Sequence, residues 1–294
     1  MTQPTFSLII PTKRRPNEIR DVLTNLRDQT ETFEVVLFND ERDEETETIV
    51  NLDWPFEIKY LYSEQNSNSC RSRNACLEKA TGDWIVFLDD DLVIEPNFLT
   101  WVNEQSLTYD CFTPQIILPP NKTKTRGWFK QFTQSHWTGK TLKWLGFFVA
   151  GFDQKITKPI PVEHMVGATM IFKHSLVKDV RFDEWIGEGT GYLDDTDFTH
   201  SVRARHNTQP YLLPGYTMMH LQASSGGNRE HDPKRWFYYY QAHKIYFFRK
   251  HIPIALPSVV LISAVEATLR SFQKRSNLLS TYVRATIAGL SQKS

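Results

Sequence analysis

Short apolar runs alternate with amphipathic stretches through the first third of the chain. Four runs have the length and the β-branched and aromatic content of buried strands: Phe6–Ile10, Phe33–Phe38, Ile58–Leu61 and Trp84–Leu88. Helices are expected between them, over residues 17–27, after the acidic residues 41–47, and over residues 73–80. Strands that alternate with helices in this way favour a parallel sheet covered by helices.

Polar residues follow three of these strands. Thr12, Asp40 and the triplet Asp89–Asp91 stand at the carboxyl ends of the apolar runs. Ligands of open α/β sheets bind beyond the carboxyl ends of the strands. We therefore expect these residues to meet at one edge of the sheet and to form a binding site there.

The second half of the chain has a less regular pattern. It predicts a strand at Val166–Phe172 and a helix at Tyr238–Phe248. The apolar segment Ile252–Val265 is broken by prolines and closed by Glu266. Because a bilayer span needs about 20 predominantly apolar residues, we expect this segment to form a helix that lies at a membrane interface or packs on the domain.

These patterns predict an α/β fold with a mostly parallel central sheet, helices on both faces and a C-terminal helical tail. We expect one domain over residues 1–250, followed by a tail over residues 251–294. The domain is expected to consist of a first half, residues 1–115, and a second half, residues 116–250.

Residues 120–150 form an insert in which lysines and arginines interleave with aromatic residues, among them Trp137, Lys140, Lys143 and Trp144. Such a stretch is typical of a surface that contacts an anionic membrane or an acidic acceptor. Solvated lysines around a small aromatic cluster explain the pattern nearly as well, so both interpretations stay open.

Composition narrows the class of protein. The 294 residues include 34 basic and 34 acidic side chains, so the overall charge gives no reason to expect nucleic acid as a partner. The three cysteines lack a Cys-x-x-Cys spacing, which argues against a zinc site and a disulfide framework. The short apolar run near the N-terminus is followed by basic residues rather than preceded by them. We expect a cytoplasmic protein, with peripheral contact to the inner face of the plasma membrane as an option.

The triplet Asp89–Asp91 carries the most specific chemical signal. Three adjacent carboxylates repel one another, so a folded domain needs a cation to neutralise them. The oxygen ligands of Asp89 and Asp91 suit Mg2+ or Mn2+, whose shell is completed by water and substrate phosphates. The alternative is an acidic turn that caps the next helix.

An ordered set of segments resembles a known family, the inverting family-2 glycosyltransferases with the GT-A, Rossmann-like nucleotide-diphosphosugar transferase fold. The segments are, in chain order, Leu8–Thr12, Val35–Asp40, Arg71–Ala75, Phe87–Asp91, Arg181–Glu184 and Leu193–Phe198 with Arg203. By this resemblance, residues 1–115 bind a nucleotide sugar and residues 116–250 bind the acceptor. The tail lies outside the matched region.

The resemblance implies roles for particular residues. Asp89, Asp91 and His220 are expected to bind Mn2+ or Mg2+. The residues expected to contact the UDP, dTDP or GDP sugar donor are Pro11, Thr12, Arg14, Asp40, Arg73, Asp89 and Asp90. Asp195 is expected to be the catalytic base, with Asp194 beside it, while Asp194 and Asp197 compete for that role. The acceptor is expected to be a glycan or a lipid-linked molecule.

The sequence also departs from the family pattern. Asn39–Arg42 replaces the usual Asp-Asp-Gly-Ser, and Asp194 stands where a glutamate is typical. Of the Gln-x-x-Arg-Trp motif of processive members only the end is kept, in Lys234–Trp236, which favours a single addition over polymerisation.

Two other functions fit the sequence less well. A nucleotidyltransferase of related fold normally has a glycine-rich loop after the first strand, and residues 11–15 contain no glycine. A non-catalytic subunit that binds sugar nucleotides would not need the acidic pair Asp194–Asp195.

Overall fold

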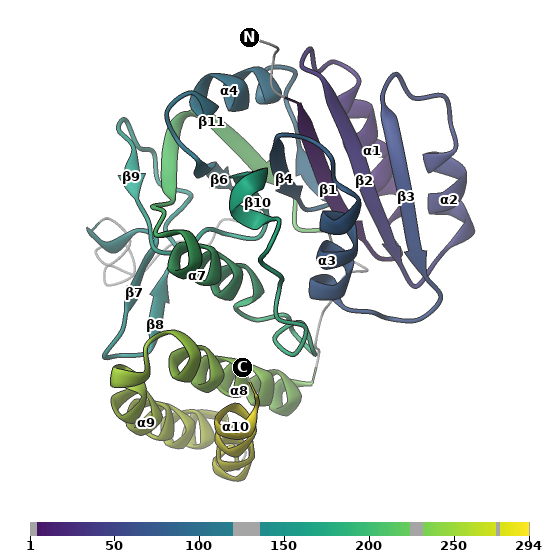
Figure 1. Cartoon of the computed structure of the whole chain (residues 1–294). Helices are drawn as coiled ribbons and strands as arrows, with labels where there is room; N and C mark the ends of the chain where they lie inside the picture. Colours follow the sequence, from purple (N-terminus) through teal and green to yellow (C-terminus); the bar gives the residue numbers. More distant parts are fainter. Residues whose placement is uncertain (1–4, 120–135, 224–231, 275–276, 294) are drawn as a thin grey trace.

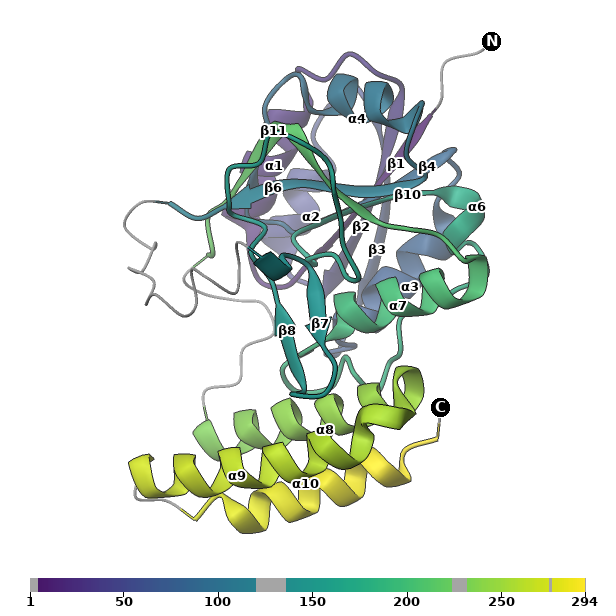
Figure 2. The same cartoon turned by 90° about the vertical axis from the view of Figure 1, so that its left-hand side faces the viewer.

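The computed structural model describes residues 5–119, 136–223, 232–274 and 277–293. Within these residues the centre of the molecule is a mixed nine-stranded sheet with the order β3-β2-β1-β4-β10-β6-β11-β5, and β9 pairs with β11 (Figure 1). Helices cover both faces of the sheet, and three further helices form a layer at one end of the molecule (Figure 2).

The first half of the sheet is parallel, as predicted. In spatial order its strands are β3 (Glu57–Ser63), β2 (Phe33–Asp40), β1 (Phe6–Thr12) and β4 (Trp84–Leu88). The register pairs Thr12 with Asn39, and Asp40 with Ser63. The polar residues that follow these strands therefore lie along one edge of the sheet.

The helices divide between the two faces of this sheet. One face is covered by α1 (Pro16–Leu26), α2 (Glu44–Val50) and α4 (Phe98–Ser106), and the other by α3 (Ser69–Lys79), α6 (His174–Val177) and α7 (Asp194–His206). Alternate strand residues point to opposite faces. Leu8 and Ile10 therefore pack against α1, whereas Ile9 belongs to the core under α3 and α7. The predicted α/β class with helices on both faces is confirmed.

The remaining strands make the sheet mixed. They are β10 (Thr169–Lys173), β6 (Cys111–Ile117), β11 (Tyr211–His220), β5 (Leu92–Val93) and β9 (Ile160–Pro161). β10 runs antiparallel between β4 and β6, and β11 is parallel to β6 but antiparallel to β5 and β9. Both neighbours of β6 come from later in the chain, so the two predicted halves share a single sheet.

The C-terminal layer consists of α8 (Pro233–His251), the short 3-10 helix η2 (Pro253–Ala255), α9 (Leu256–Lys274) and α10 (Leu279–Ser291). Asp232 caps α8 by accepting a hydrogen bond from the backbone N–H of Lys234. α9 and α10 lie on the side of α8 that faces away from the sheet (Figures 1 and 2). The predicted tail therefore packs together with α8, which begins before residue 251.

The apolar helix in this layer is longer than the sequence suggested. The segment Pro253–Gln273 has 21 residues. Its most apolar stretch of 18 residues has a mean hydropathy of 1.4, and 22% of that stretch is buried. By length and composition it is the one helix among the described residues that suffices to cross a membrane. The expectation of a shorter segment was wrong because Glu266 does not end the helix. Its carboxylate is paired with Lys244 at 3.1 Å and with Arg270 at 2.9 Å.

The insert is described only in part, because residues 120–135 lie outside the described ranges. Its later part forms a hairpin of β7 (Lys140–Leu142) and β8 (Phe147–Val149). Phe148 contacts the ring of Phe247 on α8 at a centroid distance of 5.0 Å. The hairpin therefore connects the sheet domain to the helical layer.

A buried charge network joins α7 to α8. Asp197, in the first turn of α7, is completely buried and accepts hydrogen bonds from Lys250 at 2.8 Å and from His251 at 2.7 Å. Lys250 also donates to Asp183 at 3.1 Å, and Tyr246 donates to the same carboxylate at 2.6 Å. The helical layer is thus attached directly to the start of α7.

Candidate functional site

A cleft of about 670 Å³ opens at the carboxyl edge of the parallel strands. It is lined by Pro11, Thr12, Lys13, Arg15, Asp40, Ser69, Ser72, Arg73, Asp89, Asp90, Asp91, Thr190, Gly191, Asp194, His220, Gln222 and Ala223. Most of the residues predicted for the site line this cleft, from both halves of the chain. The exceptions are Arg14 and Asp195.

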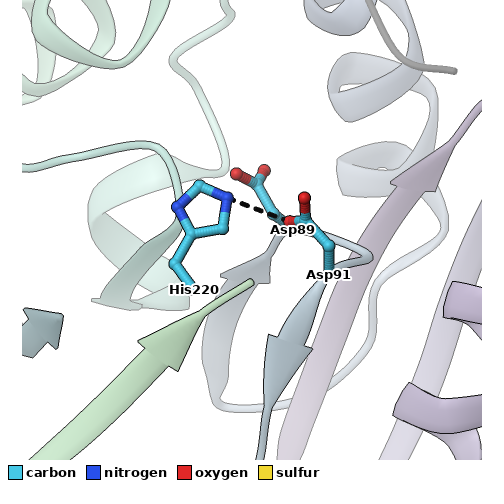
Figure 3. Close-up of side chains that lie close together, drawn as sticks. All are labelled: Asp89, Asp91 and His220. Carbon is cyan, nitrogen blue, oxygen red and sulfur yellow. Dashed lines mark ion pairs between the residues drawn. The ribbon is translucent and has the colours of Figure 1, made fainter. Parts of the chain in front are cut away.

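Asp89, Asp91 and His220 form a compact cluster in the cleft. One ligand atom of each lies within 4.8 Å of the others, and Figure 3 shows the three side chains turned toward one another. His220 Nε2 is 3.0 Å from Asp91 Oδ1. Two carboxylates and an imidazole are ligand types that bind Mn2+. The structure therefore brings together the three residues predicted as metal ligands.

The pairing of two strands of the sheet positions His220 in this cluster. His220 is the last residue of β11 and pairs with Leu92, the first residue of β5, directly after Asp91. The backbone N–H of Leu221 donates to the carbonyl oxygen of Asp91 at 2.9 Å. The short antiparallel pairing of β5 with β11 thus fixes the position of His220.

The surroundings of Asp91 fit a cation. Its Oδ1 is buried and accepts no well-aligned hydrogen bond from the described residues, while Oδ2 accepts one from the N–H of Ala223 at 2.7 Å. Burial acts to raise the pKa of Asp91, but His220, the Ala223 N–H and Arg15 outweigh it and lower that pKa to about 2. Asp91 is therefore ionised at neutral pH and has an oxygen directed at the cluster.

Asp90 faces away from this cluster. Its Oδ2 accepts a hydrogen bond from Thr12 at 2.7 Å, and its Oδ1 forms an ion pair with Arg15 at 2.6 Å. Burial raises the pKa of Asp90 to about 7, although Arg15 and Thr12 act in the opposite direction. Asp90 lines the cleft, but its carboxylate oxygens hold the loop that follows β1.

That loop separates two adjacent arginines. Arg14 has a positive φ of 54°, and its guanidinium pairs with Glu41 at 2.5 Å outside the cleft. Arg15 turns inward to Asp90 and lies 3.6 Å from Asp91 Oδ2. The structure therefore places Arg15, which the sequence did not single out, at the position that was expected for Arg14.

Asp40 lies at another part of the cleft, at the end of β2. Its Oδ1 accepts hydrogen bonds from Ser63 at 2.9 Å and from the N–H of Ser67 at 2.7 Å. Among the described residues no hydrogen bond to Oδ2 occurs, and Asp40 is one of the lining residues. A carboxylate held in this way offers an acceptor to a ligand ring placed against β2.

Arg73 connects the two sides of the cleft. It is buried at the start of α3, where it donates to Asp194 at 2.8 Å and to Asp89 at 3.3 Å. Ser69 donates to the same oxygen of Asp194 at 3.0 Å. Arg73 therefore connects the cluster of Asp89, Asp91 and His220 to Asp194 on α7.

Asp195 lies beside the cleft rather than among its lining residues. Its Oδ2 accepts the N–H of Gly167 at 2.7 Å, and its Oδ1 accepts the N–H of Thr196 at 2.5 Å. Burial and the charge of Asp194 raise the pKa of Asp195 to about 6, against the effect of these hydrogen bonds. A carboxyl group with this pKa changes its protonation state near physiological pH.

Several lining residues were not predicted from the sequence. Lys13, Ser69, Ser72, Thr190 and Gln222 stand on loops or helix starts near the predicted motifs. Ser69 opens α3 directly after Asn68, which caps the helix with a positive φ of 70°. The polar loop before α3 was the available signal, but its side-chain directions depend on this backbone turn.

The remnant of the processive motif lies outside the cleft. Lys234 and Trp236 are in the first turns of α8 and line a separate cavity of about 290 Å³ together with Arg270 and Leu278. Trp236 stacks on Tyr240 with a centroid distance of 5.1 Å. These residues therefore belong to the helical layer.

Comparison with known sequences identifies one family. The family described as glycosyl transferase family 2 matches residues 7–181, which is more than half of the 294 residues. The match includes Asp40, Arg73 and Asp89–Asp91 and ends before Asp194 and His220.

Curated relatives match shorter segments. An uncharacterized glycosyltransferase of Haemophilus influenzae is 34% identical over 87 residues, which is 29% of this chain and 29% of the relative. The succinoglycan biosynthesis protein ExoM of Rhizobium meliloti is 41% identical over 54 residues, which is 18% of this chain and 17% of ExoM. The matched segments thus span less than a third of these relatives.

Solved structures resemble the whole chain. The S. aureus TarS 1-349 structure has a TM-score of 0.57 at 18% identity. The superposed region covers 96% of this chain and 81% of the TarS chain. The mannosyltransferase PcManGT from Pyrobaculum calidifontis, in complex with GDP-Man and Mn2+, has a TM-score of 0.57 at 15% identity, with coverages of 100% and 89%. At such identities the likeness concerns the fold.

Proposed function

Because the chain belongs to glycosyl transferase family 2 and is therefore a glycosyltransferase, we propose that it transfers one sugar, with inversion and with the help of a divalent metal, from a nucleotide diphosphosugar to a hydroxyl group. The observation that carries this proposal is the cluster of Asp89, Asp91 and His220. It lies in the same cleft as Asp40 and Asp194. The acceptor in this proposal is a glycan or a lipid-linked molecule.

The donor is a UDP-, dTDP- or GDP-sugar in this proposal. Among the similar structures, TarS was solved with UDP and with UDP-GlcNAc, and PcManGT with GDP-Man. The base of the nucleotide is placed against β2, where Asp40 accepts its ring N–H. Pro11 and Thr12 line the path from there to Asp89. The diphosphate then lies beside the metal-ligand cluster.

The metal in this proposal is Mn2+ or Mg2+, held by Asp91 and His220 with Asp89. When bound, it neutralises the departing diphosphate as a Lewis acid. Arg73 keeps Asp89 and Asp194 at a fixed separation through its two hydrogen bonds. Arg15 holds Asp90 away from the cluster, so that two carboxylates rather than three face the substrate.

Asp195 is the proposed general base, and it removes the proton of the acceptor hydroxyl. Its pKa of about 6 suits that role, since the carboxylate form predominates at pH 7 and still binds a proton well. Asp194 instead pairs with Arg73 and Ser69.

The position of Lys234–Trp236 away from the cleft supports a single addition. The proposed location is cytoplasmic, with peripheral contact to the inner face of the plasma membrane.

A thermal-shift panel tests the donor and metal parts of this proposal. UDP, dTDP, GDP and ADP are each added with Mn2+, Mg2+ or EDTA to wild type and to Asp91→Asn. A ligand at about 100 times its Kd stabilises the fold by about 2.7 kcal/mol. We expect a metal-dependent shift with one nucleotide in wild type and none with Asp91→Asn.

The matched control is Asp110→Asn, because Asp110 is an exposed carboxylate that pairs with Lys173 far from the cleft. It is expected to respond to the nucleotide like wild type. A shift that persists in EDTA would contradict the metal, and the absence of any shift would favour a non-catalytic relative.

A further inference from the structure

The outer surface of α9 and α10 is apolar. On α9 the exposed apolar side chains recur at helical spacing, and a matching row follows α10; the two rows are Leu261, Val265, Leu269 and Phe272, and Leu279, Val283, Ile287 and Leu290. Phe272 is 80% exposed and Ile287 61% exposed. Soluble domains rarely expose contiguous apolar patches of this kind without a partner.

Charges are nearly missing from this surface. Among the described side chains of α9, the exposed ones other than the apolar row are Pro257, Thr268 and Gln273. On α10 the exposed charged residue is Arg284, and within the described residues neither helix exposes an acidic side chain. Residues 252–294 as a whole contain five basic residues and one acidic residue, Glu266. The described part of this surface is therefore apolar, and the charge that it exposes, on Arg284, is positive.

The packing of α9 and α10 on α8 argues against a bilayer crossing by α9. α9 packs along α8, where Lys244 is 1% exposed and pairs with Glu266 of α9 at 3.1 Å. If α9 crossed the bilayer, Glu266 would enter the hydrocarbon and Lys244 would lose its partner, which is costly. Gly289 of α10 also packs so closely on α8 that an added Cβ would lie 2.5 Å from the carbonyl oxygen of Ala242.

We propose that the outer face of α9 and α10 is a monotopic docking surface for an anionic lipid bilayer. An amphipathic surface of this type lies in the interface plane, with its apolar side chains among the acyl chains and its basic residues at the headgroups. This face is at the end of the molecule opposite to α4 (Figure 2).

The docking surface deepens the proposed function, since it rests on a lipid-linked acceptor, and it is close to the catalytic cleft. Tyr192 lies between the lining residues Gly191 and Asp194 and contacts Tyr240 of α8 at a centroid distance of 4.8 Å. α8 therefore separates the acceptor side of the cleft from the docking surface. An acceptor held in the bilayer would meet the cleft beside α8.

Flotation of the full chain with vesicles tests the inference. The probes are vesicles of phosphatidylglycerol with phosphatidylethanolamine and vesicles of phosphatidylcholine. Wild type is expected to float with the anionic vesicles and less with the neutral ones. A triple variant then combines Leu269→Gln, Phe272→Gln and Ile287→Gln. Each lost apolar side chain is expected to weaken partitioning into the vesicles about tenfold, so the triple variant stays at the bottom of the gradient.

The control is Leu107→Gln, because Leu107 is 86% exposed at the end of α4, far from the proposed surface. It is expected to float like wild type. Equal flotation of the triple variant and wild type, or no flotation of wild type, overturns the proposal. A wild type that is a dimer in solution, becomes a monomer in the triple variant and floats in neither form points to a second copy instead.

A further measurement keeps the test independent of the fold and of catalysis. The nucleotide-dependent thermal shift of the triple variant, measured without vesicles, is expected to equal that of wild type. Its loss would show that the cleft was damaged.

Discussion

At the residue scale, the loop after β1 shows how two identical side chains acquire different environments. Arg14 is exposed and pairs with Glu41, whereas Arg15 is buried against Asp90. Breaking a buried ion pair by removing one partner leaves an uncompensated charge, at a cost of about 3–5 kcal/mol. The consequences of removing these arginines should therefore differ strongly.

We predict that Arg15→Met lowers the free energy of unfolding by about 3 kcal/mol, while Arg14→Met changes it by less than about 1 kcal/mol. Urea denaturation at pH 7 measures both. The double variant Arg15→Met with Asp90→Asn should recover part of the loss, because the buried charge is removed together with its partner. Equal effects of the two single variants would contradict the assignment of Arg15 to the interior.

A second prediction concerns the proposed base. The pKa of Asp195 is raised to about 6, and a base acts in its deprotonated form, so kcat is expected to rise with pH through about 6 and then to level off. Asp195→Asn should lower kcat by about 10² to 10⁴ and abolish that rise, with nucleotide affinity preserved.

Asp194→Asn is the matched variant for this test. Because the charge of Asp194 contributes to the raised pKa of Asp195, its removal should shift the midpoint of the pH profile to lower pH. Loss of the pH-dependent rise together with a large loss of kcat in Asp194→Asn would instead identify Asp194 as the base.

The sequence supplied residue types more reliably than side-chain directions. The motifs at Asp89–Asp91 and Asp194 combine charge with the end of a strand or the start of a helix, and the structure places Asp89, Asp91 and Asp194 in one cleft with His220. The choice between Arg14 and Arg15 was not accessible, since it depends on the positive φ at Arg14. The placement of Asp195 beside rather than in the cleft depends on its hydrogen bond to Gly167, from a segment distant in the sequence.

At the scale of elements, local patterns predicted β1 to β4 and α1 to α3, but not α4 or β6. They did not predict that β10 inserts antiparallel between β4 and β6, because strand pairing is decided by distant segments. The same limit applies to β5, a strand of two residues that fixes His220 through its pairing with β11.

The attachment of α8 to α7 gives a prediction at this scale. Lys250 neutralises two carboxylates, Asp183 and Asp197, and its removal leaves them with less positive charge. Lys250→Met is expected to destabilise the protein by about 3 kcal/mol and to lower kcat, because Asp197 is in the same helical turn as Asp195. Thermal unfolding and steady-state kinetics provide the readouts.

Lys178→Met serves as the comparison, since Lys178 is exposed at the end of α6 and forms no ion pair among the described residues. It should leave both stability and kcat unchanged. If Lys250→Met unfolded at the wild-type temperature, the helical layer would not be coupled to α7 in this way.

At the scale of the whole molecule, the sheet unites the two predicted halves. The boundary at residue 115 falls inside β6, and both neighbours of β6, β10 and β11, belong to the second half. A fragment of residues 1–115 therefore lacks the strands that cover β6. We predict that this fragment is unfolded, as measured by its circular dichroism spectrum.

The complete chain is expected to unfold the sheet in one cooperative calorimetric transition. Two separate transitions, each assigned to one half by the disappearance of its amide signals, would show that the halves are independent. A folded fragment of residues 1–115 would lead to the same conclusion.

The pairing of β5 with β11 also has a consequence for synthesis on the ribosome. Ala223, whose N–H binds Asp91, follows that aspartate by 132 residues, and His220 arrives in the same late segment. A nascent chain that has emerged only as far as β6 contains Asp89, Asp91 and Arg15 but lacks His220 and Ala223. The proposed metal site is therefore completed late in translation, and a product that terminates before residue 220 would lack one of the three proposed ligands.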